Sequence, residues 1–248
     1  MKQNSFSKKR IIHLSVVVFV VVIIILIAVF LMFKYHVEGE KNLPFKLSSI
    51  NIISTAESKL SQDEEEIWHA GILQKNDIYF VIEKSSTYNK QDAIKSISFE
   101  NFAITKENEN IIAEIYRPTT SISTYNYTEE YKIENSLKFE GAQNTNIETL
   151  QINNQGGLIG FSVTLDNLGK YIFDTNEKVP SDGTLLAKAG IKEEDIKFKI
   201  SFDLIIETES ENKFKANIIL DLPIGNITKN GVETMQDTEL NNIIFKRF

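Results

Sequence analysis

The longest apolar run in the chain extends from residue 11 to residue 33, and no polar side chain interrupts it between Val16 and Phe33. As a helix at roughly 1.5 Å per residue, this run would span about 35 Å, more than the roughly 30 Å of a bilayer's hydrocarbon core. A single segment in lipid can satisfy its backbone hydrogen bonds only as a helix. The pattern therefore predicts a transmembrane helix over residues 11–33, with the lipid bilayer as its partner.

The flanks of this run favour an uncleaved signal-anchor over a cleaved signal peptide. Signal peptides have apolar cores of about 7–15 residues, followed by small residues at the cleavage site. Here the run is longer, and the bulky residues Lys34, Tyr35 and His36 follow it. The chain contains no cysteine, which excludes processing as a bacterial lipoprotein.

Charges around the anchor predict its orientation. The anchor is preceded by four basic residues, Lys2, Lys8, Lys9 and Arg10. The first acidic residue is Glu38, and segments rich in Lys and Arg tend to remain in the cytoplasm. We therefore expect residues 1–10 to form a cytoplasmic tail, residues 34–44 a juxtamembrane connector, and residues 45–248 an extracytoplasmic domain.

The strongest alternation of apolar and polar positions lies between residues 195 and 208. One face of this segment is apolar throughout: Ile196, Phe198, Ile200, Phe202, Leu204 and Ile206. After a polar turn at residues 209–212, a second segment alternates in the same way, with apolar residues Phe214, Ala216, Ile218, Leu220 and Leu222. A period of two is typical of half-buried strands. The pattern predicts an antiparallel hairpin at the centre of the core.

The chain before Pro118 reads as strands separated by polar segments. We expect strands at residues 45–54, 67–74, 78–84, 93–105 and 111–117. The acidic residues 57–66 predict a loop or a short helical turn, and Lys75-Asn76-Asp77 predicts the tight turn of a hairpin. In the fourth strand the apolar phase slips by one residue at Glu100-Asn101, which indicates a β-bulge or a bend.

The chain after Pro118 contains shorter strands and one helix. We expect strands at residues 130–134, 137–139, 148–153, 158–165 and 242–246. The sequence Asn154-Gln155-Gly156-Gly157 predicts a turn with two glycines at positive φ. Residues 180–191 predict a short helix, capped by Ser181 or Asp182 and ended by Gly190.

About ten short strands with polar turns predict a mainly β fold, an antiparallel β-sandwich, immunoglobulin-like or related, with one short helix. No alternation of strands with long helices calls for a parallel sheet. Two arrangements of residues 45–248 remain open: one sandwich, or two subdomains divided near residue 118.

Composition restricts the partners and the compartment. Residues 34–248 carry 23 Lys and Arg against 34 Asp and Glu, a net charge of −11. Such a domain repels nucleic acid, so we expect no nucleic-acid partner. Without cysteine, it must be held by its core alone. Heavy use of Ile, Asn, Lys and Glu favours an AT-rich bacterial source, and the layout resembles that of single-pass envelope proteins of such bacteria.

Candidate catalytic and metal-binding residues are few. His13 lies in the first turn of the anchor and His36 just after its end. His69 has no cysteine or second histidine nearby with which to bind zinc. A serine nucleophile elbow, a phosphate-binding loop and a dinucleotide-binding glycine pattern are all absent from the sequence. The sequence therefore nominates no catalytic residue, no cofactor-binding residue and no metal ligand, and implies no cofactor.

Two polar clusters have both a functional and a structural interpretation. Asp63-Glu64-Glu65-Glu66 could contribute to a Ca²⁺ site, but its spacing does not match an EF-hand and a solvated charge run is favoured. A second cluster consists of Tyr116, Tyr125, Tyr127 and Tyr131. Exposed tyrosines can stack on sugars or peptides, although tyrosines are also common as ordinary strand residues, which is the favoured interpretation.

The sequence favours a non-enzymatic binding, scaffolding or assembly module of the cell envelope, with an unknown protein or glycan partner. A carboxylate-dependent envelope hydrolase is the first alternative, because two carboxylates brought together by folding are enough for glycoside hydrolysis. A pilin-like subunit is the second. Residues 11–15, Ile-Ile-His-Leu-Ser, lack the glycine, phenylalanine and glutamate that would strengthen a resemblance to type IV pilins.

Overall fold

The computed structural model describes residues 4–63, 67–119, 124–142, 150–173, 184–240 and 242–248. The chain divides into two compact units, Met1–Lys41 and Asn42–Phe248. Strands from both sides of residue 118 lie in each of the two sheets of the second unit, and these strands share one main core.

The first unit is formed by one long helix, α1 (Asn4–Glu38). Its segment Ile12–Glu38 is long and apolar enough to cross a membrane, in agreement with the predicted anchor. The helix continues to residue 38, through the first part of the segment 34–44 that is predicted as a juxtamembrane connector. It ends where Gly39 adopts a left-handed φ of 71° and donates its N–H to the Tyr35 carbonyl at 2.8 Å.

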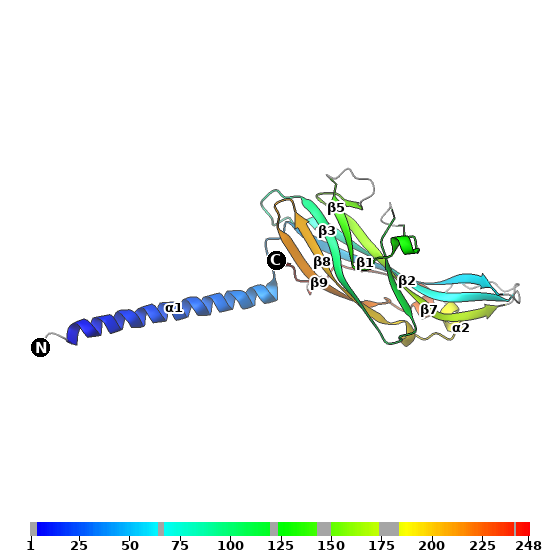
Figure 1. The fold of residues 1–248 in the computed structure, drawn as a ribbon, viewed down its shortest axis with the longest axis horizontal. Helices are drawn as coiled ribbons and strands as arrows, with labels where there is room; N and C mark the ends of the chain where they lie inside the picture. Colours follow the sequence, from blue (N-terminus) through cyan, green and yellow to red (C-terminus); the bar gives the residue numbers. More distant parts are fainter. Residues whose placement is uncertain (1–3, 64–66, 120–123, 143–149, 174–183, 241) are drawn as a thin grey trace. The chain divides into compact units, whose positions relative to one another are not determined.

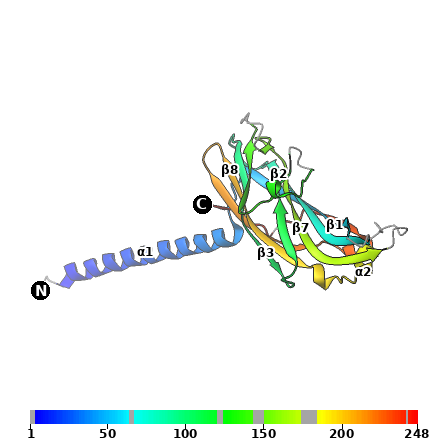
Figure 2. The same ribbon diagram turned by 45° about the vertical axis from the view of Figure 1, so that its right-hand side comes forward.

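The second unit is a β-sandwich, which confirms the predicted fold class (Figures 1 and 2). One sheet, sheet A, has the strand order β10-β1-β2-β7-β4, with bounds Val232–Asp237, Phe45–Gln62, Trp68–Lys84, Gly156–Phe173 and Ile112–Tyr116. The other, sheet B, has the order β11-β9-β8-β3-β5-β6, with bounds Lys246–Arg247, Lys213–Leu222, Phe198–Thr208, Ile94–Lys106, Ser136–Gly141 and Gln151–Ile152. Among the strands of the described residues, β5 and β6 pair in parallel and the other pairs are antiparallel.

The main core fills the space between the sheets. Phe80 and Phe161 of sheet A meet Phe99 and Phe202 of sheet B, and their ring centroids lie 4.9–5.8 Å apart. Tilted and edge-to-face pairs of this kind contribute beyond the area that they bury. The centre of the fold is therefore a cluster of phenylalanines held by strands from both layers.

The hairpin β8–β9 confirms the clearest sequence prediction. Its register pairs Phe198 with Leu222 and Ile206 with Phe214 without a shift. The predicted apolar positions of β8 are all buried: Phe198, Ile200, Phe202, Leu204 and Ile206. Ile196 is also buried but lies in a 3₁₀ turn, η2 (Glu194–Ile196), before the strand.

Two predictions about the first strands are wrong. Residues 57–62, expected in a loop or helical turn, belong to β1, and Lys75-Asn76-Asp77 lies in the middle of β2 instead of forming a turn. Asn76 is fully buried, and its side chain bonds to Ser54 at 2.7 Å. Asn and Asp favour turns when their side chains are solvated. Here the folded chain supplies a buried hydrogen-bond partner for Asn76, so this residue can lie inside a strand.

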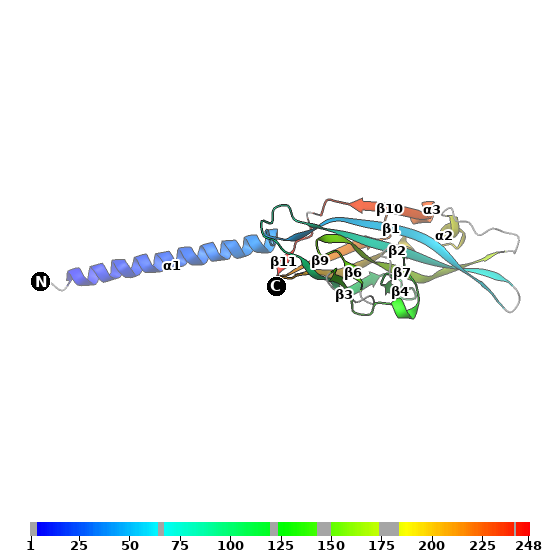
Figure 3. The ribbon, with the colours of Figure 1, turned by 90° about the horizontal axis from the view of Figure 1, so that it is seen from above.

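A second, smaller core lies beside the end of β1, the start of β2 and the end of β7, which run side by side (Figure 3). Two short helices, α2 (Thr184–Lys188) and α3 (Ile227–Asn230), contribute to it. Its buried members are Ala70, Ile72, Leu185, Leu186, Ile191, Ile196 and Ile227. Along β2, the buried polar pair Gln74 and Asn76 separates this core from the main one.

The remaining predictions are confirmed in part. The register shift in β3 after Glu100 and the φ of 56° at Asn101 confirm the bulge, and both Gly156 and Gly157 have positive φ. Gly190 ends α2 with a φ of 72°, while the proposed caps Ser181 and Asp182 lie outside the described residues.

Three predicted strands differ from those observed. Residues 130–134 contain a 3₁₀ turn, η1 (Glu129–Tyr131), instead of a strand. The strand expected at 242–246 is only the two-residue β11, and that expected at 148–153 is only β6, with residues 148–149 outside the described chain. The sequence pattern also gave no indication of β10, because an edge strand with few buried side chains has little apolar periodicity.

Candidate functional site

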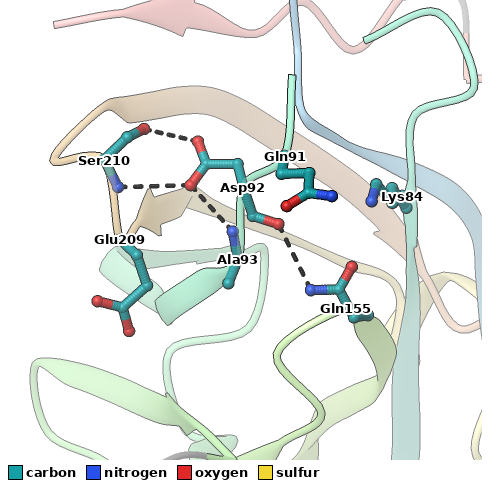
Figure 4. A pocket seen from close by; sticks show the side chains of 7 residues that line it. All are labelled: Lys84, Gln91, Asp92, Ala93, Gln155, Glu209 and Ser210. Atoms are coloured by element: carbon teal, nitrogen blue, oxygen red, sulfur yellow. Dashed lines mark hydrogen bonds between the residues drawn. The ribbon is translucent and has the colours of Figure 1, made fainter. Parts of the chain in front are cut away.

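An open hollow with a volume of about 650 Å³ lies at the end of the sandwich where β1 begins (Figure 4). Three connections form it: the loop between β2 and β3, the turn before β7, and the turn between β8 and β9. Its lining consists of Lys84, Gln91, Asp92, Ala93, Gln155, Glu209 and Ser210. Segments far apart in sequence thus meet in one polar depression.

Asp92 holds these three connections together. Its carboxylate accepts hydrogen bonds from the Ser210 hydroxyl at 2.6 Å and from the Ala93 N–H at 2.9 Å. The Gln155 side chain donates to the Asp92 carbonyl at 3.4 Å (Figure 4). These contacts fix the shape of the hollow, so Asp92 and Ser210 act as structural residues here.

The rim of the hollow offers groups for ionic and hydrogen-bonded contacts. Lys84 and Glu209 are exposed and carry opposite charges, and Gln91 and Gln155 add exposed amides. None of the described residues that line the hollow is a histidine, and the Ser210 hydroxyl donates to Asp92. The arrangement suits binding of a polar ligand better than nucleophilic chemistry, which needs a base beside the nucleophile.

Tyrosines form a second cluster on the outer face of sheet A. Tyr116 contacts Tyr127 with ring centroids 5.2 Å apart, and Tyr125 lies 6.3 Å from both Tyr127 and Tyr79. The structure thus brings together three of the four tyrosines that are expected to cluster, and Tyr79 joins them. Tyr131 instead packs under the guanidinium group of a neighbouring arginine, at 5.1 Å from the ring.

The cluster covers the sheet instead of presenting free aromatic faces. Tyr116 is only 5% exposed, and Tyr125 and Tyr127 are half-buried. The ammonium group of Lys75 lies over the ring of Tyr127, at 4.2 Å from its centroid. These packed rings favour the structural interpretation of the tyrosines.

Asp77 lies within this cluster. The Tyr127 hydroxyl lies 3.4 Å from its carboxylate, in position to donate a hydrogen bond. Burial raises the pKa of Asp77 above its usual 3.8, although hydrogen bonds from Ser162 and Tyr127 oppose the rise. The carboxylate is therefore held where its charged form is disfavoured.

We expect Asp77→Asn to raise the melting temperature of residues 42–248 at about pH 7, because it removes a charge that burial disfavours. The folded-state pKa is raised, so the folded protein takes up this proton at a higher pH than the unfolded chain. The cost of the charge is thus present above the raised pKa and disappears as the pH falls toward the usual value of 3.8. Melts of both proteins at about pH 7 and pH 3 test this; a lower melting temperature for the variant at neutral pH would contradict it.

A small pocket beside the tyrosines bears on the hydrolase alternative. Its volume is about 90 Å³, and its acidic lining residues are Glu57, Glu114 and Asp166. Burial alone would raise the pKa of Glu114, but hydrogen bonds from Lys132 and Tyr116 lower it below its usual range. Burial of Asp166 is likewise outweighed by a hydrogen bond from Lys59, which lowers its pKa.

This pocket does not favour hydrolysis. The pocket is small, with room for a few water molecules. A glycosidase also needs one carboxyl group that stays protonated, whereas the pKa values of Glu114 and Asp166 are both lowered.

Of the other predicted polar residues, Asp63 directly follows β1 and His69 lies at the start of β2. Asp63 accepts from the Ile67 N–H at 2.9 Å and contacts His69 Nε2 at 2.8 Å, while Glu64 to Glu66 lie outside the described residues. His69 Nδ1 is buried and has no hydrogen-bond partner in the described structure. Within the described ranges, no group of three His, Cys, Asp or Glu side chains could hold a metal ion.

No protein-family model, no curated protein and no solved structure matches this chain.

Proposed function

We propose that this chain is a membrane-anchored binding module of the cell envelope, with α1 spanning the membrane and the β-sandwich outside the cytoplasm. The apolar segment Ile12–Glu38 supports the anchor. The basic tail before it supports a cytoplasmic N terminus, because Lys and Arg are retained on that side.

The hollow at the end of the sandwich carries the binding role. Loops at the ends of β-sandwiches are common positions for recognition, because a rigid scaffold holds them. Here Asp92 fixes three loops around a depression whose rim presents Lys84 and Glu209. The rim of the hollow thus offers one positive charge, one negative charge and side-chain amides. A peptide can pair with all of these, because it carries charged side chains of both signs and a backbone amide at each residue. The proposed ligand class is therefore a peptide segment.

Titration of ¹⁵N-labelled residues 42–248 with the peptide Ala-Glu-Lys-Ala, and separately with neutral chitotriose, tests this site. The peptide is expected to shift amide signals of residues 84–93, 154–155 and 209–211 more strongly than the sugar does. Lys84→Glu should reduce the shifts severalfold, whereas Lys170→Glu, an exposed charge on β7 outside the hollow, should leave them unchanged. Absence of shifts with the peptide, or equal shifts in both variants, would reject the hollow as a peptide site.

The proposed orientation makes a separate prediction. Protease added to intact protoplasts should digest the β-sandwich and leave an epitope fused to the N-terminal tail protected, since the four basic residues keep that tail inside. Detergent-treated cells serve as the control in which the tail is also cut. Loss of the epitope in intact protoplasts, with the sandwich protected, would reverse the orientation.

A further inference from the structure

The small pocket beside the tyrosines lies where a bulge interrupts sheet A. Strand β2 pairs with β7 on both sides of Leu73, but residues 166–168 of β7 lie opposite this single residue. Asn167, within the bulge, has a φ of 63°. Leu73 and Asp166 both line the pocket, which has a volume of about 90 Å³. The irregular pairing thus leaves room between β2 and β7 for a small ligand, and bulges are frequent next to active sites.

Two carboxylates of the pocket lining already use both of their oxygens. Glu114 accepts from the Tyr116 hydroxyl at 2.5 Å and from the Lys132 ammonium group at 2.6 Å. Asp166 accepts from the Lys59 ammonium group at 2.7 Å and from the backbone N–H of the next residue at 2.7 Å. These carboxylates therefore form walls of the pocket, and other groups must supply the contacts with a ligand.

Unused hydrogen-bond donors line the same pocket. Thr164 is only 5% exposed, and its hydroxyl has no hydrogen-bond partner in the described part of the chain. A hydroxyl so deeply buried needs a partner, which here must come from the pocket. Lys59 and Lys75 also line the pocket, and each ammonium group donates to one carboxylate within the described residues. An ammonium group has three N–H donors, so both lysines retain unused ones.

One acceptor complements these donors. Glu57 accepts from Lys75 with one oxygen, and its other oxygen has no hydrogen bond within the described residues. Glu57 and Lys59 lie two positions apart on β1 and so share a face. On the neighbouring strands, Thr164 is paired with Lys75. Side chains in such positions lie about 5–8 Å apart, so one small molecule can reach the donors and the free carboxylate oxygen together.

We infer that this pocket binds a small free α-amino acid. The carboxylate of the ligand accepts hydrogen bonds from Thr164 and the two lysines, and its ammonium group donates to the free oxygen of Glu57. A zwitterion suits this lining, because three lysines balance its three carboxylates in ion pairs. The pocket has room for a few water molecules, so glycine and alanine are the members of the class that fit. The site is separate from the proposed peptide site, because the pocket and the hollow share no lining residue.

Equilibrium dialysis of the full chain in detergent micelles against radiolabelled glycine tests this site. Saturable binding of one glycine per chain is expected. Acetate and methylamine each carry one of the two charged groups of glycine, so each should compete at least about tenfold more weakly, because hydrogen bonds to charged groups contribute that much to affinity. Absence of glycine binding would overturn the inference. Acetate that bound as tightly as glycine would indicate a simple anion site and overturn it as well.

Thr164→Val removes the hydroxyl and keeps the branched shape of the side chain. It should weaken glycine binding at least about tenfold. Its melting temperature without ligand should not fall, because the hydroxyl makes no hydrogen bond within the described residues of the free chain. Thr105→Val, at an exposed threonine on β3 outside the pocket, is the matched control and should bind glycine like the natural chain. Equal glycine affinity of the two variants would contradict the site.

Glu57→Gln tests the contact with the ammonium group. The change keeps the length of the side chain and removes its charge, so the preference for glycine over acetate should fall severalfold. Thermal melts establish that the variant is folded. An unchanged preference would show that Glu57 does not hold the ammonium group, and the assignment of an amino acid to this pocket would fall with it.

Discussion

Replacing Phe202 with alanine is expected to lower the free energy of unfolding of residues 42–248 by about 3–5 kcal/mol. Phe202 is fully buried, and its ring lies 5.2–5.8 Å from those of Phe80, Phe99, Phe102 and Phe161. The cost combines the lost transfer free energy of the ring with the cavity left among its neighbours. With no disulfide in the chain and a typical total stability of about 5–15 kcal/mol, this loss should be plain in a urea melt.

Lys199→Ala is the matched control for this experiment. Lys199 lies on the outer face of the same strand, in an ion pair with Asp221 at 2.9 Å, and both side chains are exposed. Exposed pairs of this kind typically contribute at most about 1 kcal/mol. If Lys199→Ala destabilised the domain as much as Phe202→Ala, the assignment of the two faces of β8 would be wrong.

The sequence could predict the elements whose own residues decide their structure. In β8, five apolar residues alternate without interruption, so local periodicity and tertiary burial agree. The slip at Glu100-Asn101 was visible because the apolar phase changes on either side of it. Gly190 and Gly39 both end a helix with a positive φ, but the sequence predicts only the helix end at Gly190. The end of the membrane segment was predicted from hydrophobicity alone, which does not detect a capping glycine.

Predictions were wrong where distant partners override local preference. Residues 57–62 of β1 are mostly polar, and they form a strand because β2 pairs with them from Leu73 to Trp68. The register supplies backbone hydrogen bonds that no property of the segment itself encodes.

The candidate sites show the same limit. Three of the clustered tyrosines lie within twelve positions in sequence, which made their proximity predictable, whereas Tyr79 joins them only through the sheet. Asp92, Gln155 and Ser210 are separated by more than fifty positions, and no motif connects them. A hollow made by three unrelated loops carries no signal in a single sequence.

Replacing Asn76 with alanine is expected to destabilise the sandwich by about 2–4 kcal/mol, because its buried side chain satisfies other buried groups. The Ser54 hydroxyl donates to Asn76 Oδ1 at 2.7 Å, and the Gln74 amide donates to the same atom at 3.2 Å. All three side chains are fully buried. Without Asn76, two donors lose their acceptor where water does not reach them, at about 1–3 kcal/mol for each group left unsatisfied.

The neighbouring substitution Asp77→Asn makes this prediction specific. Adjacent residues of a strand point to opposite faces, so Asn76 faces the interior while Asp77 lies among the outer tyrosines. Urea melts at neutral pH should therefore show a large loss of stability for Asn76→Ala and none for Asp77→Asn. In the hairpin turn that the local sequence predicts, both side chains would be solvated and both variants nearly neutral. A change of less than about 0.5 kcal/mol for Asn76→Ala would thus favour the turn and contradict the continuous strand β2.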